Sequence, residues 1–216
     1  MKRLFLTSSV HAVAHDIVKR VDLSRGNRLV FITTAAEPKQ GDLTWLKNDR
    51  QALVDAGFDL IDYTITNKLQ DQLKKELSPF DYIYLSGGDT PYLLKQSQKT
   101  GFINIVRELI NKEGKVYIGT SAGSIIAGPK LPEYLFEDDG EAPDKVKNEG
   151  YGFINFTVVP HWGSEDFRDR YLNKRLKIAY KKDQVPLLLL TDSQYVSVEN
   201  DKFEIVNVVA SAYVYV

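Results

Sequence analysis

Five short apolar runs in the first 120 residues are each followed by a stretch in which apolar residues recur at helical spacing. The runs cover residues 3–7, 28–33, 58–63, 82–85 and 116–119. Strands that alternate with helices are joined by crossover connections, which produce a parallel sheet covered by helices. The pattern therefore predicts an α/β fold of three layers, in which a mostly parallel sheet is flanked by helices.

The remainder of the chain has a different pattern. An acidic loop is expected over residues 130–150 and a basic helix over residues 164–182, and short apolar runs surround them. These runs cover residues 153–159, 187–190, 195–199, 203–208 and 213–216. Residues 199–202, Glu-Asn-Asp-Lys, have the composition of a hairpin turn. We expect a single α/β domain over residues 1–216, with a β-rich C-terminal part.

The composition excludes several classes of function. The 28 basic and 29 acidic residues give a net charge of -1, so no overall field favours nucleic acid or an anionic membrane as a partner. Without cysteine, the chain forms no disulfide, thiolate nucleophile or zinc–thiolate site. No apolar run has the length of a signal peptide or a membrane span. We expect a cytoplasmic protein, as a monomer or small homo-oligomer.

The run at residues 116–119 ends in Gly-Thr-Ser-Ala-Gly, residues 119–123, which is a Gly-x-Ser-x-Gly pattern. Small residues on both sides of the serine allow a sharp turn between a strand and a helix, which exposes the hydroxyl group. Residues 124–127, Ser-Ile-Ile-Ala, supply the start of that helix. Ser121 is therefore the candidate nucleophile, and a purely structural turn is the alternative interpretation.

A serine hydroxyl needs a base, and the chain has three histidines, His11, His15 and His161. His161 follows an apolar run and would emerge at the carboxyl end of a strand, where sites gather in open parallel sheets. We predict His161 as the base, with a loop histidine packed beside Trp162 as the alternative. His11 and His15 lie one helical turn apart, but no carboxylate stands between them, so a solvated helix face is favoured over a metal clip.

The third member of such a triad is an acid that orients the imidazole. The loop between the serine and the histidine contains Glu137, Asp138 and Asp139. Glu137 is predicted, with Asp138 as the alternative, because the chain must turn after the helix and return to the site. A solvated run of charges is the other interpretation of these acids.

A second glycine-rich turn, Leu-Ser-Gly-Gly-Asp-Thr-Pro, occupies residues 85–91. Adjacent glycines allow a backbone amide to point into a cavity, as the stabilisation of an oxyanion requires. We predict the amides of Gly88 and Ala122 as the two oxyanion donors. The Walker lysine of a phosphate-binding loop is absent, and no Gly-x-Gly-x-x-Gly follows the first strand, so nucleotide binding is disfavoured.

The chain resembles the serine peptidase family that includes dipeptidase E and cyanophycinase. Three motifs in the same order carry the resemblance: Gly-Gly-Asp-Thr at 87–90, Tyr-Ile-Gly-Thr-Ser-Ala-Gly at 117–123 and Pro-His at 160–161. The resemblance implies a flavodoxin-like fold similar to class I glutamine amidotransferases, with serine in place of their cysteine. It also implies a triad of Ser121, His161 and Glu137, without a metal or organic cofactor.

The leading hypothesis is a serine exopeptidase that acts on short peptides. An esterase of the α/β-hydrolase type shares the serine motif, but His161 follows Ser121 by only 40 residues, which leaves little room for the later strands of that fold. A binding protein that kept the fold and lost catalysis is the third hypothesis.

Charges near the predicted site bear on the choice of substrate. The expected basic helix carries seven basic and three acidic residues, of which Arg168 and Arg170 lie nearest to His161 and are the candidates for binding a substrate carboxylate. Asp89, where dipeptidase E has asparagine, is the third candidate and would repel a negative side chain. We expect only a weak preference for an N-terminal aspartate.

Overall fold

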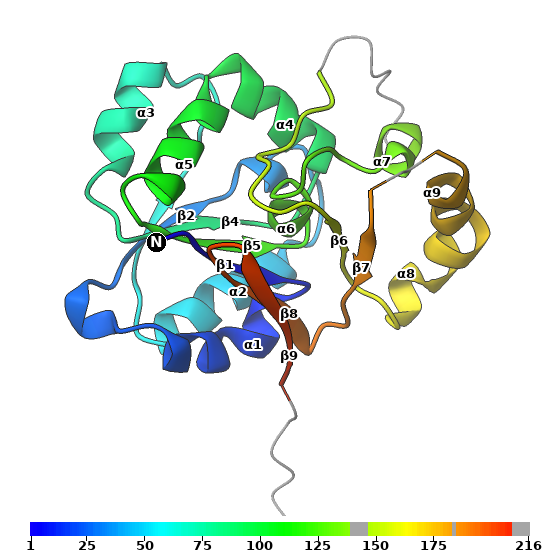
Figure 1. Ribbon diagram of the computed structural model, residues 1–216, viewed down its shortest axis with the longest axis horizontal. Helices are drawn as coiled ribbons and strands as arrows, with labels where there is room; N and C mark the ends of the chain where they lie inside the picture. Colours follow the sequence, from blue (N-terminus) through cyan, green and yellow to red (C-terminus); the bar gives the residue numbers. More distant parts are fainter. Residues whose placement is uncertain (139–146, 183–184, 209–216) are drawn as a thin grey trace, which may run out of the picture.

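The computed structural model describes residues 1–138, 147–182 and 185–208. Its main sheet has the strand order β3-β2-β4-β5-β1-β8-β9 (Figure 1). The strands are β1 (Arg3–Thr7), β2 (Arg28–Ile32), β3 (Asp59–Tyr63), β4 (Tyr82–Leu85), β5 (Val116–Thr120), β8 (Gln194–Glu199) and β9 (Lys202–Asn207). The first five run parallel, whereas β8 is antiparallel to β1 and β9 is antiparallel to β8. The predicted mostly parallel sheet is confirmed.

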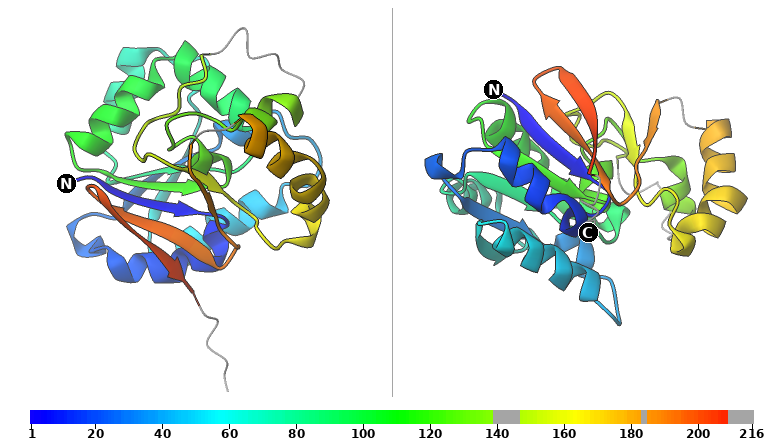
Figure 2. Two further views of the ribbon diagram at one scale, coloured as in Figure 1. Left: turned by 45° about the vertical axis from the view of Figure 1, so that its right-hand side comes forward. Right: turned by 90° about the horizontal axis from the view of Figure 1, so that it is seen from below.

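Helices cover both faces of this sheet (Figures 1 and 2). They are α1 (Val10–Ile17) and α2 (Thr44–Asp55) on one face, and α3 (Gln70–Leu77), α4 (Thr90–Lys99), α5 (Phe102–Asn111) and α6 (Ala122–Ile125) on the other. Successive side chains of a strand point to opposite faces, so Leu4 and Leu6 join the core under α4 and α5, while Phe5 joins the core under α1. Short 3₁₀ segments cover Val18–Arg20, Leu23–Arg25 and Thr34–Ala36.

A smaller unit lies beyond the carboxyl ends of the parallel strands (Figures 1 and 2). It contains a two-stranded parallel sheet, β6 (Thr157–Val159) and β7 (Leu187–Leu189). Its helices are α7 (Glu133–Asp138), α8 (Glu165–Arg170), the π-helical segment Tyr171–Arg175 and α9 (Leu176–Lys182). The predicted basic helix is therefore present in three consecutive pieces.

Two expectations for the connecting segments have different outcomes. The hairpin turn predicted at residues 199–202 joins β8 to β9, and Asn200 in it has a φ of 55°. The segment predicted as a loop from residue 130 contains α7, because Tyr134, Leu135 and Phe136 bury their side chains in the core. The apolar run expected at residues 213–216 lies outside the described residues.

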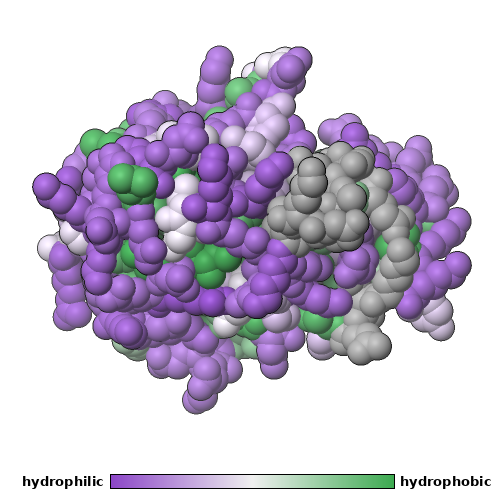
Figure 3. Space-filling model, turned by 90° about the horizontal axis from the view of Figure 1, so that it is seen from above, coloured by the Kyte–Doolittle hydropathy of each residue, from purple (hydrophilic) through white to green (hydrophobic). Residues whose placement is uncertain are grey.

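The surface is mainly polar. On the face shown in Figure 3, hydrophilic side chains cover most of the area contributed by the described residues, and hydrophobic ones form small separate patches. In the part of the chain that the structure describes, no helix is both long and apolar enough to cross a membrane.

The turn from β5 to α6 depends on close contact between backbone segments. A Cβ atom on Gly119 would lie 2.6 Å from the carbonyl carbon of Gly123, and a Cβ atom on Gly123 would lie 2.3 Å from the carbonyl oxygen of Leu85. Real Cβ atoms do not approach other atoms so closely. Ser124 also fixes the turn, since its hydroxyl donates to the carbonyl oxygens of Thr7 and Gly119 at 2.7 and 2.8 Å. Both glycines are needed for α6 to pack against β4.

We expect Gly123→Ala to lower the free energy of unfolding by more than about 2 kcal/mol, because the added methyl group meets rigid backbone. Gly41→Ala is the matched control: Gly41 has a φ of 90° with no atom within 4 Å of an added Cβ, so only strain of about 1 kcal/mol is expected there. Urea denaturation of both variants measures the difference. Equal losses would contradict the role of backbone contact.

Candidate active site

A cleft of about 590 Å³ lies at the carboxyl ends of the parallel strands. One wall consists of residues that directly follow a strand: Ser8 and Ser9 after β1, Gly87 and Gly88 after β4, and Ser121 after β5. The opposite walls come from residues 39–45 and from the segment between His161 and Arg175. The predicted nucleophile and the predicted base thus line one cleft, at the edge of the sheet where the sequence placed them.

Ser121 and His161 are hydrogen-bonded to each other. Nε2 of His161 lies 3.1 Å from Oγ of Ser121. Ser121 has a φ of 49° and His161 a φ of 60°. Both values lie in the left-handed region, which residues other than glycine rarely adopt. Strain of this kind costs about 1–3 kcal/mol per residue and persists where the surrounding structure enforces it. The two strained residues here are the two that meet across the cleft.

Asp192 completes the chain of hydrogen bonds. Its Oδ1 atom lies 2.8 Å from Nδ1 of His161, and it stands between β7 and β8. The hydrogen bond from His161 lowers the pKa of Asp192, and the hydrogen bond from Ser8 adds to this effect while partial burial opposes it. An ionised carboxylate only accepts hydrogen bonds, so the network assigns the proton to Nδ1. In neutral His161, Nε2 then carries the lone pair that faces the Ser121 hydroxyl.

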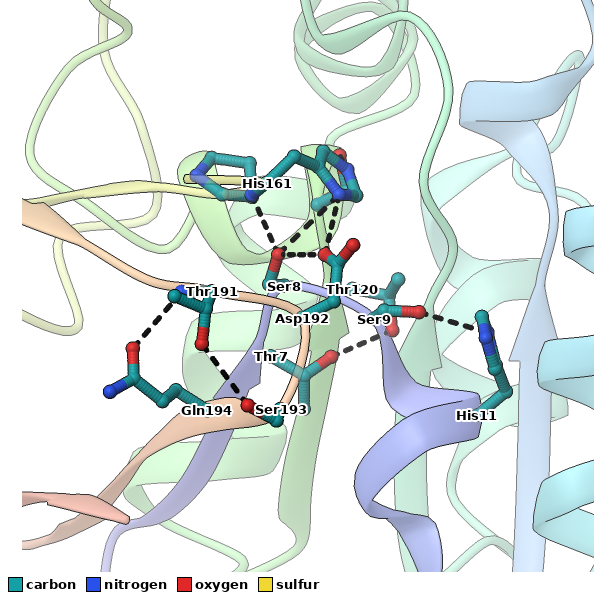
Figure 4. A network of polar contacts seen from close by, with 12 residues as sticks. Thr7, Ser8, Ser9, His11, Thr120, His161, Thr191, Asp192, Ser193 and Gln194 are labelled. Atoms are coloured by element: carbon teal, nitrogen blue, oxygen red, sulfur yellow. Dashed lines mark hydrogen bonds and ion pairs between the residues drawn. The ribbon is translucent and has the colours of Figure 1, made fainter. Parts of the chain in front are cut away.

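The buried hydroxyl group of Ser8 fixes both partners (Figure 4). It accepts a hydrogen bond from the backbone N–H of His161 at 2.7 Å and donates one to Oδ1 of Asp192 at 2.6 Å. The ring of Phe167 stacks on the imidazole with a centroid distance of 4.5 Å and an interplanar angle of 21°. Backbone, ring plane and tautomer of His161 are therefore each held by a separate contact.

The acid at His161 corrects the sequence analysis, which predicted Glu137 with Asp138 as the alternative. The structure gives the position beside Nδ1 to Asp192. Glu137 and Asp138 form the end of α7, and their side chains lie outside the described residues, as does Asp139 entirely. The predicted acids all lie between Ser121 and His161 in the sequence, whereas Asp192 follows His161 by 31 residues. The sequence does contain a signal for Asp192, which is an acid two residues after the apolar run at residues 187–190.

The second glycine-rich turn lies directly beside Ser121. A Cβ atom on Gly87 would be 3.3 Å from Cβ of Ser121, and one on Gly88, whose φ is 136°, would be 2.1 Å from the carbonyl oxygen of Ala35. Among the described residues, none accepts a hydrogen bond from the amide of Gly88 or from that of Ala122, the first residue of α6. Both amides are available for an oxyanion, and that assignment stays a prediction.

The three predicted substrate contacts lie in different places. Arg170 lines the cleft. Arg168 lies outside the cleft lining, because it points to a smaller cavity beside Trp162 and pairs with Glu165 at 2.8 Å. Asp89 also lies outside the lining: it caps α4, where its carboxylate accepts a hydrogen bond from the N–H of Tyr92 at 2.8 Å.

Two cleft residues were not anticipated for this role. Arg175 is nearly buried, and its guanidinium group lies 5.2 Å from the ring centroids of Tyr134 and Tyr171. It ends the π-helical segment, whose extra residue per turn changes which side chains face inward and is invisible to helical periodicity. His11 was predicted on a solvated helix face, but it lines the cleft and contacts Asp49. No group of three or more potential metal ligands occurs among the described residues.

Comparisons with known proteins show which sequences this chain is similar to. The profile of peptidase family S51 matches residues 4–206. An uncharacterized peptidase of Listeria innocua is 28% identical over 78% of this chain and 80% of its own length. Peptidase E of Haemophilus influenzae is 31% identical over 50% of this chain and 46% of its own length.

Two solved structures share the fold. A Listeria monocytogenes protein provisionally named peptidase E superposes with a TM-score of 0.82 at 23% identity, covering 96% of this chain and 98% of its own. A peptidase from an acI-B1 actinobacterium superposes with a TM-score of 0.72 at 17% identity, covering 96% of this chain and 88% of its own. At these identities the similarity establishes the arrangement of helices and strands.

We expect a fluorophosphonate probe to label Ser121, because its hydroxyl group faces a base and opens into the cleft. His161→Ala should slow labelling by at least about a hundredfold, since general-base catalysis contributes about that much. Ser78→Ala, which removes an exposed serine at the end of α3 and outside the cleft lining, should still be labelled. Mass spectrometry of the labelled peptide checks the site, and labelling elsewhere would contradict the assignment.

Proposed function

We propose that this chain, which belongs to peptidase family S51 and is a peptidase, hydrolyses short peptides as a serine exopeptidase. The observation that supports the proposal most directly is the continuous hydrogen-bonded series from Ser121 through His161 to Asp192. Its three members come from three separate segments and meet at one end of the cleft, as a nucleophile, a base and an orienting acid must.

The reaction follows from this order. The Ser121 oxygen attacks the carbonyl carbon while Nε2 of His161 takes the hydroxyl proton, and the Asp192 carboxylate stabilises the imidazolium that forms. The C–N bond then breaks as His161 gives the proton to the leaving amine, which leaves an acyl group on Ser121. A water molecule, deprotonated by His161, attacks this ester and releases the acid. The proton returns to Ser121, so the enzyme is regenerated.

The carbonyl oxygen becomes negative during each attack. In the proposed arrangement the amides of Gly88 and Ala122 donate to it. Ala122 follows Ser121 in the chain, Gly88 follows Gly87, which lies beside Ser121, and neither amide has another acceptor among the described residues. Such fixed dipoles need no reorganisation during the reaction, and each donor contributes about 3 kcal/mol to transition-state stabilisation.

The dimensions of the cleft favour short substrates. Its volume of about 590 Å³ falls within the range of sites that enclose small molecules, about 300–1,000 Å³. Residues 39–45 form one wall and α8 with the π-helical segment another. A cleft of this volume suits a substrate of dipeptide size better than an extended protein segment. This supports exopeptidase activity over cleavage within folded proteins.

We expect Ser121→Ala to abolish peptide hydrolysis and Asp192→Asn to lower kcat by roughly a thousandfold to ten-thousandfold, because an amide at this position favours the wrong imidazole tautomer. Release of free amino acids from a dipeptide library provides the assay. Glu137→Gln and Asp138→Asn are the matched controls and should retain activity. If either control lost activity while Asp192→Asn kept it, the triad acid would be Glu137 or Asp138, as predicted from the sequence.

Opposite charges in the cleft bear on specificity. Three basic residues, Lys39, Arg170 and Arg175, line it together with four acidic ones, Asp42, Asp49, Asp166 and Asp192, so neither sign dominates. We expect a weak preference for N-terminal aspartate, with rates for Asp-Leu, Ala-Leu and Lys-Leu within about a hundredfold of one another, or about 3 kcal/mol. Values of kcat/KM for the three dipeptides check this, and a larger ratio would show a dedicated pocket for an acidic side chain.

A further inference from the structure

A second histidine–aspartate pair lines the same cleft. Nδ1 of His11 lies 3.1 Å from Oδ1 of Asp49 and 2.8 Å from Oγ of Ser9. His161 has the same kind of surroundings, with an aspartate and a serine hydroxyl beside Nδ1. The serines are consecutive residues at the end of β1, and Figure 4 shows their hydroxyl groups pointing in different directions, one toward His161 and one toward His11.

The carboxylate of this second pair is buried. Asp49 is 2% exposed, and its other oxygen accepts a hydrogen bond from the hydroxyl group of Tyr84 at 2.9 Å. A buried carboxylate is strongly unfavourable unless a positive charge or several hydrogen bonds compensate it. Among the described residues, His11 is the one group of opposite charge that forms an ion pair with Asp49. Asp49 therefore favours the imidazolium form of His11.

The orientation of the ring follows from these contacts. Because Asp49 accepts from Nδ1, the opposite ring nitrogen, Nε2, is the atom available to other groups. No described residue forms a hydrogen bond with Nε2, and the side chain is 44% exposed in the cleft that Ser121 also lines. His11 thus presents an N–H donor on a positive ring to whatever occupies the cleft.

We propose that Nε2–H of His11 binds a carboxylate group of the peptide substrate and so determines which short peptides the enzyme accepts. This inference rests on the proposed function, and it assigns to the site a recognition group besides Ser121, His161 and Asp192. A hydrogen bond between an imidazolium and a carboxylate is charge-assisted and stronger than a neutral one.

The other cations of the cleft are engaged differently. Lys39 pairs with Asp89 at 3.4 Å, and the Arg175 guanidinium lies among the rings of Tyr134, Phe167 and Tyr171. The Arg170 guanidinium lies over the ring of Phe167, with Cζ 5.8 Å from the ring centroid. The Nδ1 side of the His11 ring contacts the buried carboxylate of Asp49, and the Nε2 side is open to the cleft. The carboxylate that it binds is either the C-terminal one of the peptide or that of an acidic side chain, and the two sources are separable by experiment.

Binding should depend on pH in a defined direction. The charged groups that act on His11 are Asp49 on α2 and Asp192 between β7 and β8; Tyr84 on β4 donates a hydrogen bond to Asp49, and Lys39 and Asp42 line the same cleft. The hydrogen bond to Asp49 raises the pKa of His11 above its usual 6.5, partial burial opposes this, and the charges of Asp49 and Asp192 add to it. The imidazolium is present below the raised pKa and lost above it. Affinity for a carboxylate should therefore fall as the pH rises through that pKa.

The test measures binding without turnover, in the Ser121→Ala variant. Calorimetry compares Ala-Leu with Ala-Leu amide, which differ in the terminal carboxylate, and Asp-Leu amide with Asn-Leu amide, which differ in the side chain. We expect the acid to bind at least about tenfold more tightly in one of the two comparisons, a difference of about 1.4 kcal/mol. When His11→Gln is introduced into the Ser121→Ala protein, that preference should fall to less than about twofold.

His15→Gln is the matched control, because His15 lies one helical turn away on α1, is exposed and is outside the cleft lining. It should keep the preference. Thermal unfolding monitors the fold of each variant, and if His11→Gln unfolds, the pH dependence of binding in the Ser121→Ala protein provides the same test. A preference that survives His11→Gln, or the absence of any preference for an acid, overturns the proposal. Lack of peptide hydrolysis by the unaltered protein overturns instead the proposed function, which a separate activity assay measures.

Discussion

Three consecutive residues at the carboxyl end of β1 hold the cleft together. The carbonyl oxygen of Thr7 accepts hydrogen bonds from the N–H of Ser121 and the hydroxyl group of Ser124. Ser8 joins His161 to Asp192, and Ser9 contacts His11. Because β1 lies between β5 and β8 in the sheet, a displacement of its end would move the nucleophile, the base and the acid together. The positions of the nucleophile, the base, the acid and His11 therefore all depend on this strand.

Strain at the site is balanced by the packing around it. Ser121 and His161 both have left-handed backbone conformations, which side chains avoid in the absence of compensating contacts. The elbow after β5 is compensated by the close approach of Gly119 and Gly123 and by the strand beneath it, which is buried from Tyr117 to Thr120. His161 is compensated by its backbone hydrogen bond to Ser8 and by stacking on Phe167. The unusual conformations therefore occur where tertiary contacts are dense.

The sequence predicted the features that neighbouring residues determine. It did not predict those that depend on contacts between distant segments. The parallel strands, the elbow at Ser121 and the cleft position of His161 follow from apolar runs and small residues that are neighbours in sequence. Asp192 was missed because it comes after His161 in the chain: the crossover through α8 and α9 separates the two residues by 31 positions, and the parallel pairing of β6 with β7 brings them together. Arg175 was missed because the π-helical segment breaks the periodicity on which helix faces are assigned. Substrate contacts are the least predictable part of the site for the same reason.

The two histidine–aspartate pairs differ in what surrounds the carboxylate, and this difference assigns them separate tasks. Asp192 is 47% exposed and shares its charge with water and the Ser8 hydroxyl group, so it orients His161 without requiring a permanent cation beside it. Asp49 is 2% exposed, and burial leaves its charge to be compensated by His11 and the Tyr84 hydroxyl group. A base must release and accept a proton in each cycle, whereas a binding group must keep its charge. The exposed Asp192 therefore suits His161 to proton transfer, whereas the buried Asp49 suits His11 to binding an anion.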